Sequence, residues 1–317
     1  MSVLNKVKQK ILKARTILIT CHMNPDGDAI GSMLALALGL EQLGKKVFTL
    51  SIDGMPKNYR LLPGAERVLR QTNQKVDLAI VVDCNLKELL GSAYQTIKKA
   101  GDVLEIDHHE FRKPFGTLSY IDQKAAAVGE LIYALLCSLG VRMTTEIAQN
   151  ILTSLIVETN SFRLPQVRPF TFQICAEMLK TGIDFYKITN TVYWIRSKES
   201  VLLTGLCLSR CRFMKNGRIV WSIIRKEDFR KKKGREEDVD AVADEMRAIQ
   251  GVKVAVLFRE KNKNTLRVSL RSKDHINIAS IAEQFSGGGH FDIAGCFIVN
   301  NDKEIRRFLR QVGKLFQ

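Results

Sequence analysis

Apolar and polar residues alternate in blocks that predict a repeated strand–helix order in the first half of the chain. Compact apolar runs predict strands over 16–21, 47–52, 76–84 and 102–107. Apolar residues at helical spacing predict helices over 28–43, 86–99, 126–139, 144–157 and 171–180. Such alternation is typical of a mostly parallel sheet with helices on both faces, so we expect an α/β fold.

The second half has a different pattern, in which paired apolar runs are separated by short turns. Asn216-Gly217 predicts a hairpin turn between strands. The expected elements are strands over 212–215, 218–225, 253–259 and 265–271, with helices over 237–249 and 277–285. Residues 184–212 have a helical pattern. We therefore expect a catalytic domain over 1–190, a helical connector over 191–212 and a smaller α/β domain over 213–317.

Imidazoles and carboxylates gather where three of the predicted strands end. The segment 22–28, which reads His-Met-Asn-Pro-Asp-Gly-Asp, follows the first strand; Asp83 ends the third, and Asp107-His108-His109 ends the fourth. Parallel sheets bind ligands beyond the carboxyl ends of their strands. Mixed imidazole and carboxylate ligands suit divalent transition metals, and paired metals are common in enzymes that cleave phosphate esters. The candidate metal ligands from these segments are His22, Asp26, Asp28, Asp83 and His108.

Each of these residues has an ordinary structural alternative. Asp28 taken alone is best read as the N-cap of the following helix, but its neighbours favour a ligand. Asp83 ends a buried strand, where a charge is costly unless it is paired or bound to a metal, so we expect it to bridge two ions. We assign Asp107 to orienting an imidazole and His109 to contacting the substrate.

Three glycines, Gly287, Gly288 and Gly289, precede His290 near the end of the chain. Glycines allow a backbone to approach a phosphate closely and to present N–H groups to it, although a flexible hinge is the alternative reading. Ser269 and Arg271 lie on a predicted neighbouring strand and favour phosphate and base recognition, since arginine binds phosphate bidentately.

Charge is unevenly distributed along the 317 residues, whose net charge is +16. Residues 1–190 contain 23 Lys and Arg against 18 Asp and Glu, whereas residues 191–317 contain 26 against 15. The more basic second half favours a polyanionic ligand, and the alternative is a surface that only confers solubility. We interpret the basic run over 230–235 as a solvated loop in preference to an RNA contact.

Several classes of protein are disfavoured. No apolar run is long enough to span a membrane, and the amphipathic N-terminus lacks the features of a signal peptide. The seven cysteines, an odd number, fit a reducing compartment without a disulfide framework. We expect a cytoplasmic protein that does not contact membranes.

These motifs together resemble those of the DHH phosphoesterase superfamily, in the branch with a DHH-associated second domain. The chain is most similar to the bacterial nanoRNase/pAp phosphatases, and the likeness covers nearly its whole length. The matching segments, in order, are 22–32, Val82-Asp83, Asp107-His108-His109, Ser161-Phe162-Arg163, 269–272, 287–290 and Ala294-Gly295. An isolated Asp-His-His would be weak support, but the complete ordered set is specific.

The resemblance implies two Mn²⁺ ions in an active site between the two domains. One ion would be held by His22, Asp26 and Asp83, and the other by Asp28, Asp83, His108 and Glu158. It also implies that Arg163 stabilises charge on the phosphate and that His109 assists there. The sequence departs from the family pattern twice, with Glu158 where relatives have Asp and Phe291 where they often have a basic residue. We expect altered affinity for the second ion and one fewer phosphate contact.

The expected activity is metal-dependent hydrolysis of short oligoribonucleotides and of 3′-phosphoadenosine 5′-phosphate (pAp) by an activated water. The chain has no length for the further oligonucleotide-binding module of relatives that digest long strands. Alternatives are a phosphodiesterase for cyclic or linear dinucleotides, a single-strand exonuclease, and a nucleotide-binding protein impaired by Glu158. A homodimer is expected from family likeness alone.

Overall fold

The computed structural model describes residues 2–190, 192, 196–289 and 291–316. The chain separates into two compact units, residues 1–195 and 196–317. Each unit has its own sheet and its own hydrophobic core. Among the described residues, each helix is too short or too polar to cross a bilayer.

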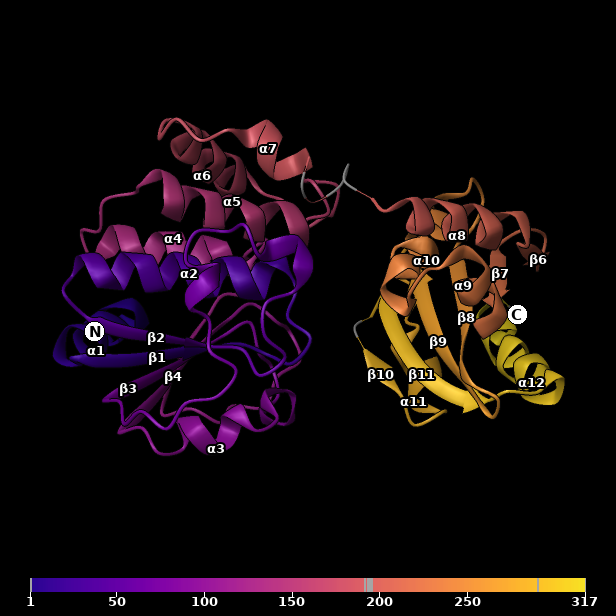
Figure 1. The fold of residues 1–317 in the computed structure, drawn as a ribbon, viewed down its shortest axis with the longest axis horizontal. Helices are drawn as coiled ribbons and strands as arrows, with labels where there is room; N and C mark the ends of the chain where they lie inside the picture. Colours follow the sequence, from indigo (N-terminus) through magenta and orange to yellow (C-terminus); the bar gives the residue numbers. More distant parts are fainter. Residues whose placement is uncertain (1, 191, 193–195, 290, 317) are drawn as a thin grey trace. The chain divides into compact units, whose positions relative to one another are not determined.

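The first unit is built on a five-stranded sheet in the order β2-β1-β3-β4-β5 (Figure 1). All its pairings are parallel. The strands are β1 (Thr16–Thr20), β2 (Lys46–Leu50), β3 (Leu78–Val82), β4 (Asp102–Asp107) and β5 (Leu118–Ile121). Because the strands are parallel, the carboxyl ends of β1, β3 and β4 lie along the same edge of the sheet.

Helices cover both faces of this sheet because β3 is apolar on both sides. Ile80 and Val82 face the core shared with α1, α2, α4 and α5, whereas Ala79 and Val81 face α3. The helices are α1 (Val3–Lys13), α2 (Gly27–Gln42), α3 (Ala93–Ile97), α4 (Val128–Ser138), α5 (Thr145–Glu158), α6 (Pro169–Leu179) and α7 (Phe185–Thr189), with short 3₁₀ turns η1 (Lys57–Tyr59), η2 (Ala65–Arg67) and η3 (Lys87–Leu90). This arrangement confirms the expected α/β architecture.

Two features of the first unit differ from the expectation. The helix expected over 86–99 is broken into η3 and α3 at Gly91, whose φ of +51° is incompatible with a continuous helix. Strand β5 was not predicted, because its four residues are all only half-buried and lack the strongly apolar pattern of β3.

The second unit contains a mixed six-stranded sheet in the order β10-β11-β9-β8-β7-β6. Its strands are β6 (Arg212–Met214), β7 (Ile219–Ile224), β8 (Val254–Asn262), β9 (Thr265–Ser272), β10 (Gly288–Gly289) and β11 (Ile293–Val299). Both expected hairpins are present, since β6 pairs antiparallel with β7 and β8 with β9, while β7 and β8 are parallel. Strand β11 was not predicted.

Helices also lie on both faces of the second sheet. They are α8 (Lys198–Ser209), α9 (Lys226–Lys232), α10 (Val242–Ala248), α11 (Ala279–Glu283) and α12 (Asp302–Gly313), with 3₁₀ turns η5 (Glu236–Val239) and η6 (Lys314–Phe316). Helix α8, from the expected connector, contributes Leu203 and Cys207 to the core beside β7 and β8. The other part of that connector lies largely outside the described residues. The basic run over 230–235 begins inside α9, so its interpretation as a loop was wrong for Arg230, Lys231 and Lys232.

Candidate metal centre

The loop after β1 places His22 and Asp26 at the carboxyl edge of the first sheet. Asp26 is the N-cap of α2, and its Oδ1 accepts hydrogen bonds from the backbone N–H groups of Asp28 (2.9 Å) and Ala29 (3.0 Å). The capping role considered for Asp28 therefore belongs to Asp26. The Nδ1 of His22 contacts the carbonyl oxygen of Met23 at 2.7 Å, which leaves its Nε2 facing Asp83.

Asp28 is fully buried in the first turn of α2 and is held from three sides. Its Oδ1 accepts hydrogen bonds from the hydroxyl groups of Ser154 (2.6 Å) and Ser32 (3.0 Å), and its Oδ2 accepts one from the backbone N–H of Val128 (2.9 Å). Contacts from α5, α2 and α4 thus fix the carboxylate in one orientation.

Asp83 follows β3 in a left-handed backbone conformation, with φ of +54°. This conformation is unfavourable for residues other than glycine, although Asp and Asn tolerate it better than most. The side chain is buried, and its Oδ1 has no hydrogen-bond partner among the described residues. A carboxylate oxygen that is buried without a donor is costly, so it fits a position where a cation binds.

The Asp107-His108-His109 segment at the end of β4 presents its two imidazoles differently. Asp107 Oδ1 lies 2.7 Å from His109 Nδ1 and orients that ring. His108 Nδ1 instead contacts the carbonyl oxygen of Ala125 at 3.0 Å. The Nε2 of His108 therefore faces Glu158 Oε1 at 3.5 Å and Asp28 Oδ2 at 3.8 Å.

Six candidate ligands converge into two sets, each with ligand atoms within 4.8 Å of one another. The sets are His22, Asp26 and Asp83, and Asp28, His108 and Glu158. A third set overlaps them and joins Asp83 to the two histidines after Asp107. Separations of 3.5 to 3.9 Å between imidazole nitrogens and carboxylate oxygens are too long for hydrogen bonds. They suit ligands that each lie about 2.0–2.2 Å from a shared ion, so the residues fit a pair of divalent metal ions.

The pKa shifts within the cluster also indicate a site for cations. Burial and the charge of Asp83 raise the pKa of Asp28 to about 7. Burial alone would raise the pKa of Asp83, but the three nearby histidines lower it to about 2. Burial would lower the pKa of His22, yet Asp83 beside it raises this pKa to about 9. The buried carboxylates thus favour positive charge, which protons on imidazoles supply when no metal is bound.

Arg112 is a functional candidate that the sequence analysis missed. Its guanidinium side chain is 10% exposed and lies behind Asp107, with Nη2 2.9 Å from Glu105 Oε1 and Nε 3.6 Å from Asp107 Oδ2. The available signal was the pair Glu105 and Asp107, two acids on the same side of a buried strand, which requires a nearby cation. Arg112 balances the acid that orients His109.

Arg163 lies in a loop whose preceding residues, Asn160, Ser161 and Phe162, all have positive φ. The guanidinium group is exposed and donates hydrogen bonds to Asn160, from Nε to the backbone oxygen (2.7 Å) and from Nη2 to Oδ1 (2.6 Å). This loop directly follows Glu158 at the end of α5. The side chain of Arg163 makes its hydrogen bonds to Asn160 within the same loop.

The predicted nucleotide-binding residues lie in the second unit. Ser269 is buried and accepts a hydrogen bond from Arg259 (2.7 Å), while Arg271 Nε contacts Asp244 at 3.1 Å. Across the sheet, Ser269 pairs with Gly295, and Gly295 pairs with Gly288. These three residues therefore form one row across β9, β11 and β10. His290 lies outside the described residues.

Packing explains two of the three glycines. A Cβ at Gly287 would lie 2.2 Å from the carbonyl oxygen of Gly295, and one at Gly289 would lie 2.3 Å from that of Ile293. A Cβ at Gly288 would meet no atom within 4 Å. Close approach to β11 therefore requires two of the glycines, and only Gly288 leaves open space for a ligand.

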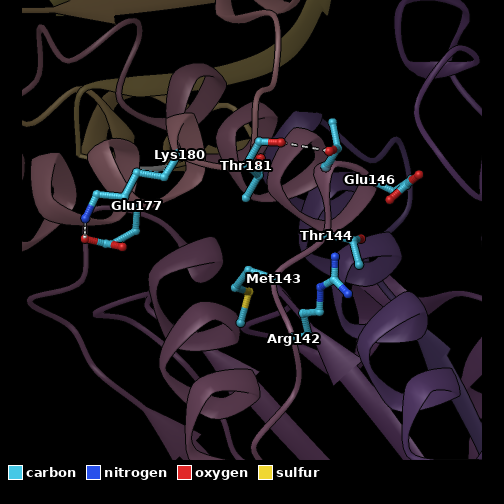
Figure 2. Close-up of a pocket in the computed structure, with 8 residues that line it drawn as sticks. Arg142, Met143, Thr144, Glu146, Glu177, Lys180 and Thr181 are labelled. Carbon is cyan, nitrogen blue, oxygen red and sulfur yellow. Dashed lines mark hydrogen bonds and ion pairs between the residues drawn. The ribbon is translucent and has the colours of Figure 1, made fainter.

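A shallow hollow of about 620 Å³ lies elsewhere in the first unit, beside the loop between α4 and α5 (Figure 2). Its lining includes an ion pair between Lys180 and Glu177 and a hydrogen bond from Thr145 to the carbonyl oxygen of Thr181. Every described candidate ligand lies outside this lining, so we assign the hollow no part in the chemistry.

Comparison with known proteins identifies the family. Residues 16–157 match the DHH family, N-terminal domain, and residues 216–317 match the DHHA1 domain. The chain is 31% identical over 307 residues to the bifunctional oligoribonuclease and PAP phosphatase NrnA of Thermus thermophilus, with 96% of this chain and 91% of that protein covered. It is 25% identical to the Bacillus subtilis protein of the same description, with 92% of each covered. The cyclic-di-AMP phosphodiesterase GdpP of Geobacillus thermodenitrificans is 24% identical, with 90% of this chain and 45% of that protein covered.

Solved structures share the fold. An exopolyphosphatase-related protein from Bacteroides fragilis has a TM-score of 0.92 at 24% identity, with 98% of this chain and 94% of that chain covered. The exonuclease RecJ bound to manganese has a TM-score of 0.55 at 14% identity, with 98% and 94% covered. The paired domains and the relative from Thermus thermophilus show that this chain belongs to the DHH family, in the group that carries a DHHA1 domain.

Proposed function

We propose that this chain is a two-metal phosphoesterase that hydrolyses short oligoribonucleotides and pAp. The observation that carries the proposal is the convergence of His22, Asp26 and Asp83 beside Asp28, His108 and Glu158. Two divalent ions, which we take to be Mn²⁺, would be held by these residues and would supply Lewis acidity and an activated water.

The side chains around this centre have separate tasks in the proposal. Asp28 is fixed by two hydroxyl groups and a backbone N–H, so its oxygens need no rearrangement when a metal binds. Asp107 holds the ring of His109 so that it can position the phosphate or assist the leaving oxygen. Arg163 would stabilise charge on the phosphoryl oxygens after exchanging its contacts with Asn160 for the substrate.

The choice of substrates rests on relatives. The Thermus thermophilus and Bacillus subtilis proteins are described as bifunctional oligoribonucleases and PAP phosphatases, and they match this chain over nearly its full length. In the second unit, Arg271, the glycine run and His290 would bind the nucleotide. A cyclic or linear dinucleotide is the second candidate substrate, favoured by the match to the cyclic-di-AMP phosphodiesterase GdpP.

Product analysis separates these substrates. The purified chain is incubated with pAp, a diribonucleotide, a triribonucleotide, cyclic di-AMP and a long single strand, each with and without Mn²⁺. We expect metal-dependent release of mononucleotides from the short RNAs and of phosphate from pAp. Faster turnover of cyclic di-AMP would favour the second candidate. Binding of these substrates without turnover of any of them would contradict the proposed enzymatic activity.

The metal assignment is tested by Asp83→Asn. Asparagine tolerates the left-handed backbone at this position but lacks the charge that a bridging ligand needs. Loss of a residue that only orients a metal ligand costs about 10–100-fold in metal affinity or activity. Asp83 is a proposed direct ligand, so we expect Asp83→Asn to lose roughly 100-fold or more in activity. Glu66→Gln, an exposed carboxamide substitution in the same unit, is the matched control. Near-normal Mn²⁺-dependent hydrolysis by Asp83→Asn would overturn the assignment.

A further inference from the structure

Helices leave one face of the second sheet uncovered along β11. On the face packed by α8, α9 and α10, the buried cluster includes residues of β7 and β8 but none from β9 or β11 among the described residues. The side chains of Ile293, Phe297 and Val299 on β11 are instead 39%, 58% and 54% exposed. The alternating residues Ala294, Cys296 and Ile298 belong to the core on the opposite face. The exposed phenyl ring of Phe297 therefore lies on β11, next to β9 and β10 in the sheet (Figure 1 shows the ribbon of these strands).

Arginines lie directly beside this ring. Arg267 of β9 pairs in register with Phe297 on one side and with Arg259 of β8 on the other. Arg271 is two positions beyond Ser269 on the same face of β9. Cross-strand neighbours lie about 4.5–5.5 Å apart at Cβ, so these cationic side chains share one surface with the ring.

The three arginines differ in whether an acidic side chain already pairs with them. Asp240 pairs with Arg259, and Asp244 pairs with Arg271. Arg259 is nevertheless only 4% exposed and has a buried Nε with no hydrogen-bond partner. Arg267 makes no hydrogen bond or ion pair with any described residue; burial and the charge of Arg259 lower its pKa, while the acids Asp240 and Glu236 only partly offset this. The N–H donors of the Arg267 guanidinium group are therefore available to bind an anionic ligand.

We propose that Phe297 and Arg267, supported by Arg259, form a binding site for a second nucleotide of a single-stranded oligonucleotide. The phenyl ring stacks on a base, and the guanidinium of Arg267 binds the adjoining phosphate. The inference rests on the proposed function, because the row of Ser269, Gly295 and Gly288 would hold the first nucleotide. The new site lies two residues farther along β9 and β11, about 7 Å away at strand spacing.

Charge complementarity favours nucleic acid as the occupant. Residues 196–317 contain 26 Lys and Arg against 15 Asp and Glu, a net charge of +11. An exposed aromatic ring next to a cation that makes no hydrogen bond or ion pair with the described residues matches how sequence-tolerant single-strand binding proteins combine stacking with phosphate contacts. The site would add affinity for chains of two or more nucleotides. It would add none for pAp, which is a single nucleotide.

Binding by the metal-free, full-length chain tests this site apart from catalysis. The probe is fluorescently labelled pentaadenylate, measured by anisotropy in EDTA at several salt concentrations. Phe297→Leu removes the ring and keeps an apolar strand residue, while Arg267→Gln removes the charge. We expect each variant to bind about tenfold more weakly. Arg267→Gln should also reduce the salt slope by about 1, and Phe297→Tyr should restore binding.

Matched controls keep the test specific. Phe213→Leu removes an exposed ring from β6 at the opposite edge of the sheet, and Arg306→Gln removes an exposed charge from α12. Both should bind like the wild type. The site is refuted if Phe297→Leu and Arg267→Gln bind within twofold of wild type, if the controls lose as much, or if the wild type does not bind pentaadenylate.

If the proposed function is wrong but the binding site is right, the experiments give a different result. In that case the wild type binds pentaadenylate in EDTA through Phe297 and Arg267 but hydrolyses no substrate when Mn²⁺ is added. Conversely, hydrolysis with undiminished pentaadenylate binding by both variants would leave the enzyme intact and remove only this site.

Discussion

Asp83 is buried, has a left-handed backbone and carries an oxygen without a hydrogen-bond donor among the described residues. A strained backbone of this kind costs of order 1–3 kcal/mol, and burying a carboxylate adds further cost. Such a combination persists only where the surroundings compensate for it. Here the compensation is positive charge, supplied by imidazolium groups without metal and, in our proposal, by two ions with it.

The raised pKa values of this cluster predict that metal binding depends on pH. His22, with a pKa of about 9, is protonated at neutral pH in the metal-free protein and must lose its proton to become a ligand. Asp28, with a pKa of about 7, adds a second proton below that pH. Burial would lower the pKa of His109, yet Asp107 and Asp83 raise it to about 9, so its proton can be released as well. The logarithm of the Mn²⁺ affinity should therefore rise by at least one per pH unit between pH 7 and 9, and more steeply below pH 7.

Isothermal titration calorimetry in buffers of different ionisation enthalpy measures the released protons directly. We expect release of at least about one proton per chain near pH 8 and almost none well above pH 9. A pH-independent affinity across this range would show that His22 is not a ligand.

Glu158 is one of the two residues at which the resemblance implies a departure from the family pattern. It ends α5, where the helix dipole disfavours a negative charge, and its Oε1 lies 3.5 Å from His108 Nε2. We expect Glu158→Gln to weaken one of two Mn²⁺ binding steps by roughly tenfold or more, and to leave the other nearly unchanged. Calorimetry can resolve the two steps. Glu146→Gln at the start of the same helix is the control, and equal effects of the two substitutions would exclude Glu158 as a ligand.

Sequence reasoning at the residue scale found the side chains that follow strands, and Asp107 among those that support them, but missed Ser154 and Arg112. His22, Asp83 and His108 lie at strand ends, where parallel topology alone predicts that they converge. Ser154 donates to Asp28 from 126 positions away, and Arg112 approaches Asp107 through a loop. Neither contact has a local sequence signal, because each depends on how distant elements pack.

At the scale of elements, close packing of α2 against α5, and of α4 against α5, keeps Asp28 in place. A Cβ at Gly31 would lie 2.5 Å from the backbone oxygen of Asn150, and one at Gly129 would lie 2.2 Å from the hydroxyl oxygen of Ser154. The absence of side chains at these two glycines allows the helices to approach closely enough for Ser154 to reach Asp28. The proposed metal site therefore depends on helix packing as well as on its candidate ligands.

Replacing Gly31 with alanine tests this dependence. The new methyl group would press on backbone atoms that cannot move aside easily, so we expect the free energy of unfolding to fall by about 1–3 kcal/mol. Gly205→Ala in α8 is the control, because nothing lies within 4 Å of its Cβ and the site is exposed in a helix. It should instead stabilise the chain by about 0.4–1 kcal/mol. Urea unfolding measures both, and a neutral Gly31→Ala would contradict the packing argument.

Elements with strong apolar patterns were predicted well, whereas several elements with weaker or alternating patterns were missed. β1 and β3 have strong apolar patterns and appear close to their expected limits. β5 is half-buried throughout, and β11 alternates between core residues and the exposed residues Phe297 and Val299. Helix α12 buries Ile305, Phe308, Leu309 and Val312 at helical spacing, so its pattern was available in the sequence and was overlooked.

At the scale of the whole molecule, the proposed function divides chemistry and recognition between the two units. The described metal-ligand candidates all belong to residues 1–195, whereas the described arginines and glycines of the nucleotide sites belong to residues 196–317. The higher positive charge of the second half favours this division. The proposed function therefore requires one substrate to engage both units, as the family resemblance implies.

The central claim is that six side chains far apart in the sequence bind two divalent ions. Diffraction data collected at the manganese absorption edge, from crystals grown with Mn²⁺, measure this directly. The account predicts two anomalous peaks about 3.5–4 Å apart, one beside His22, Asp26 and Asp83 and the other beside Asp28, His108 and Glu158. An anomalous map with no peak at these residues, in crystals saturated with Mn²⁺, would contradict it.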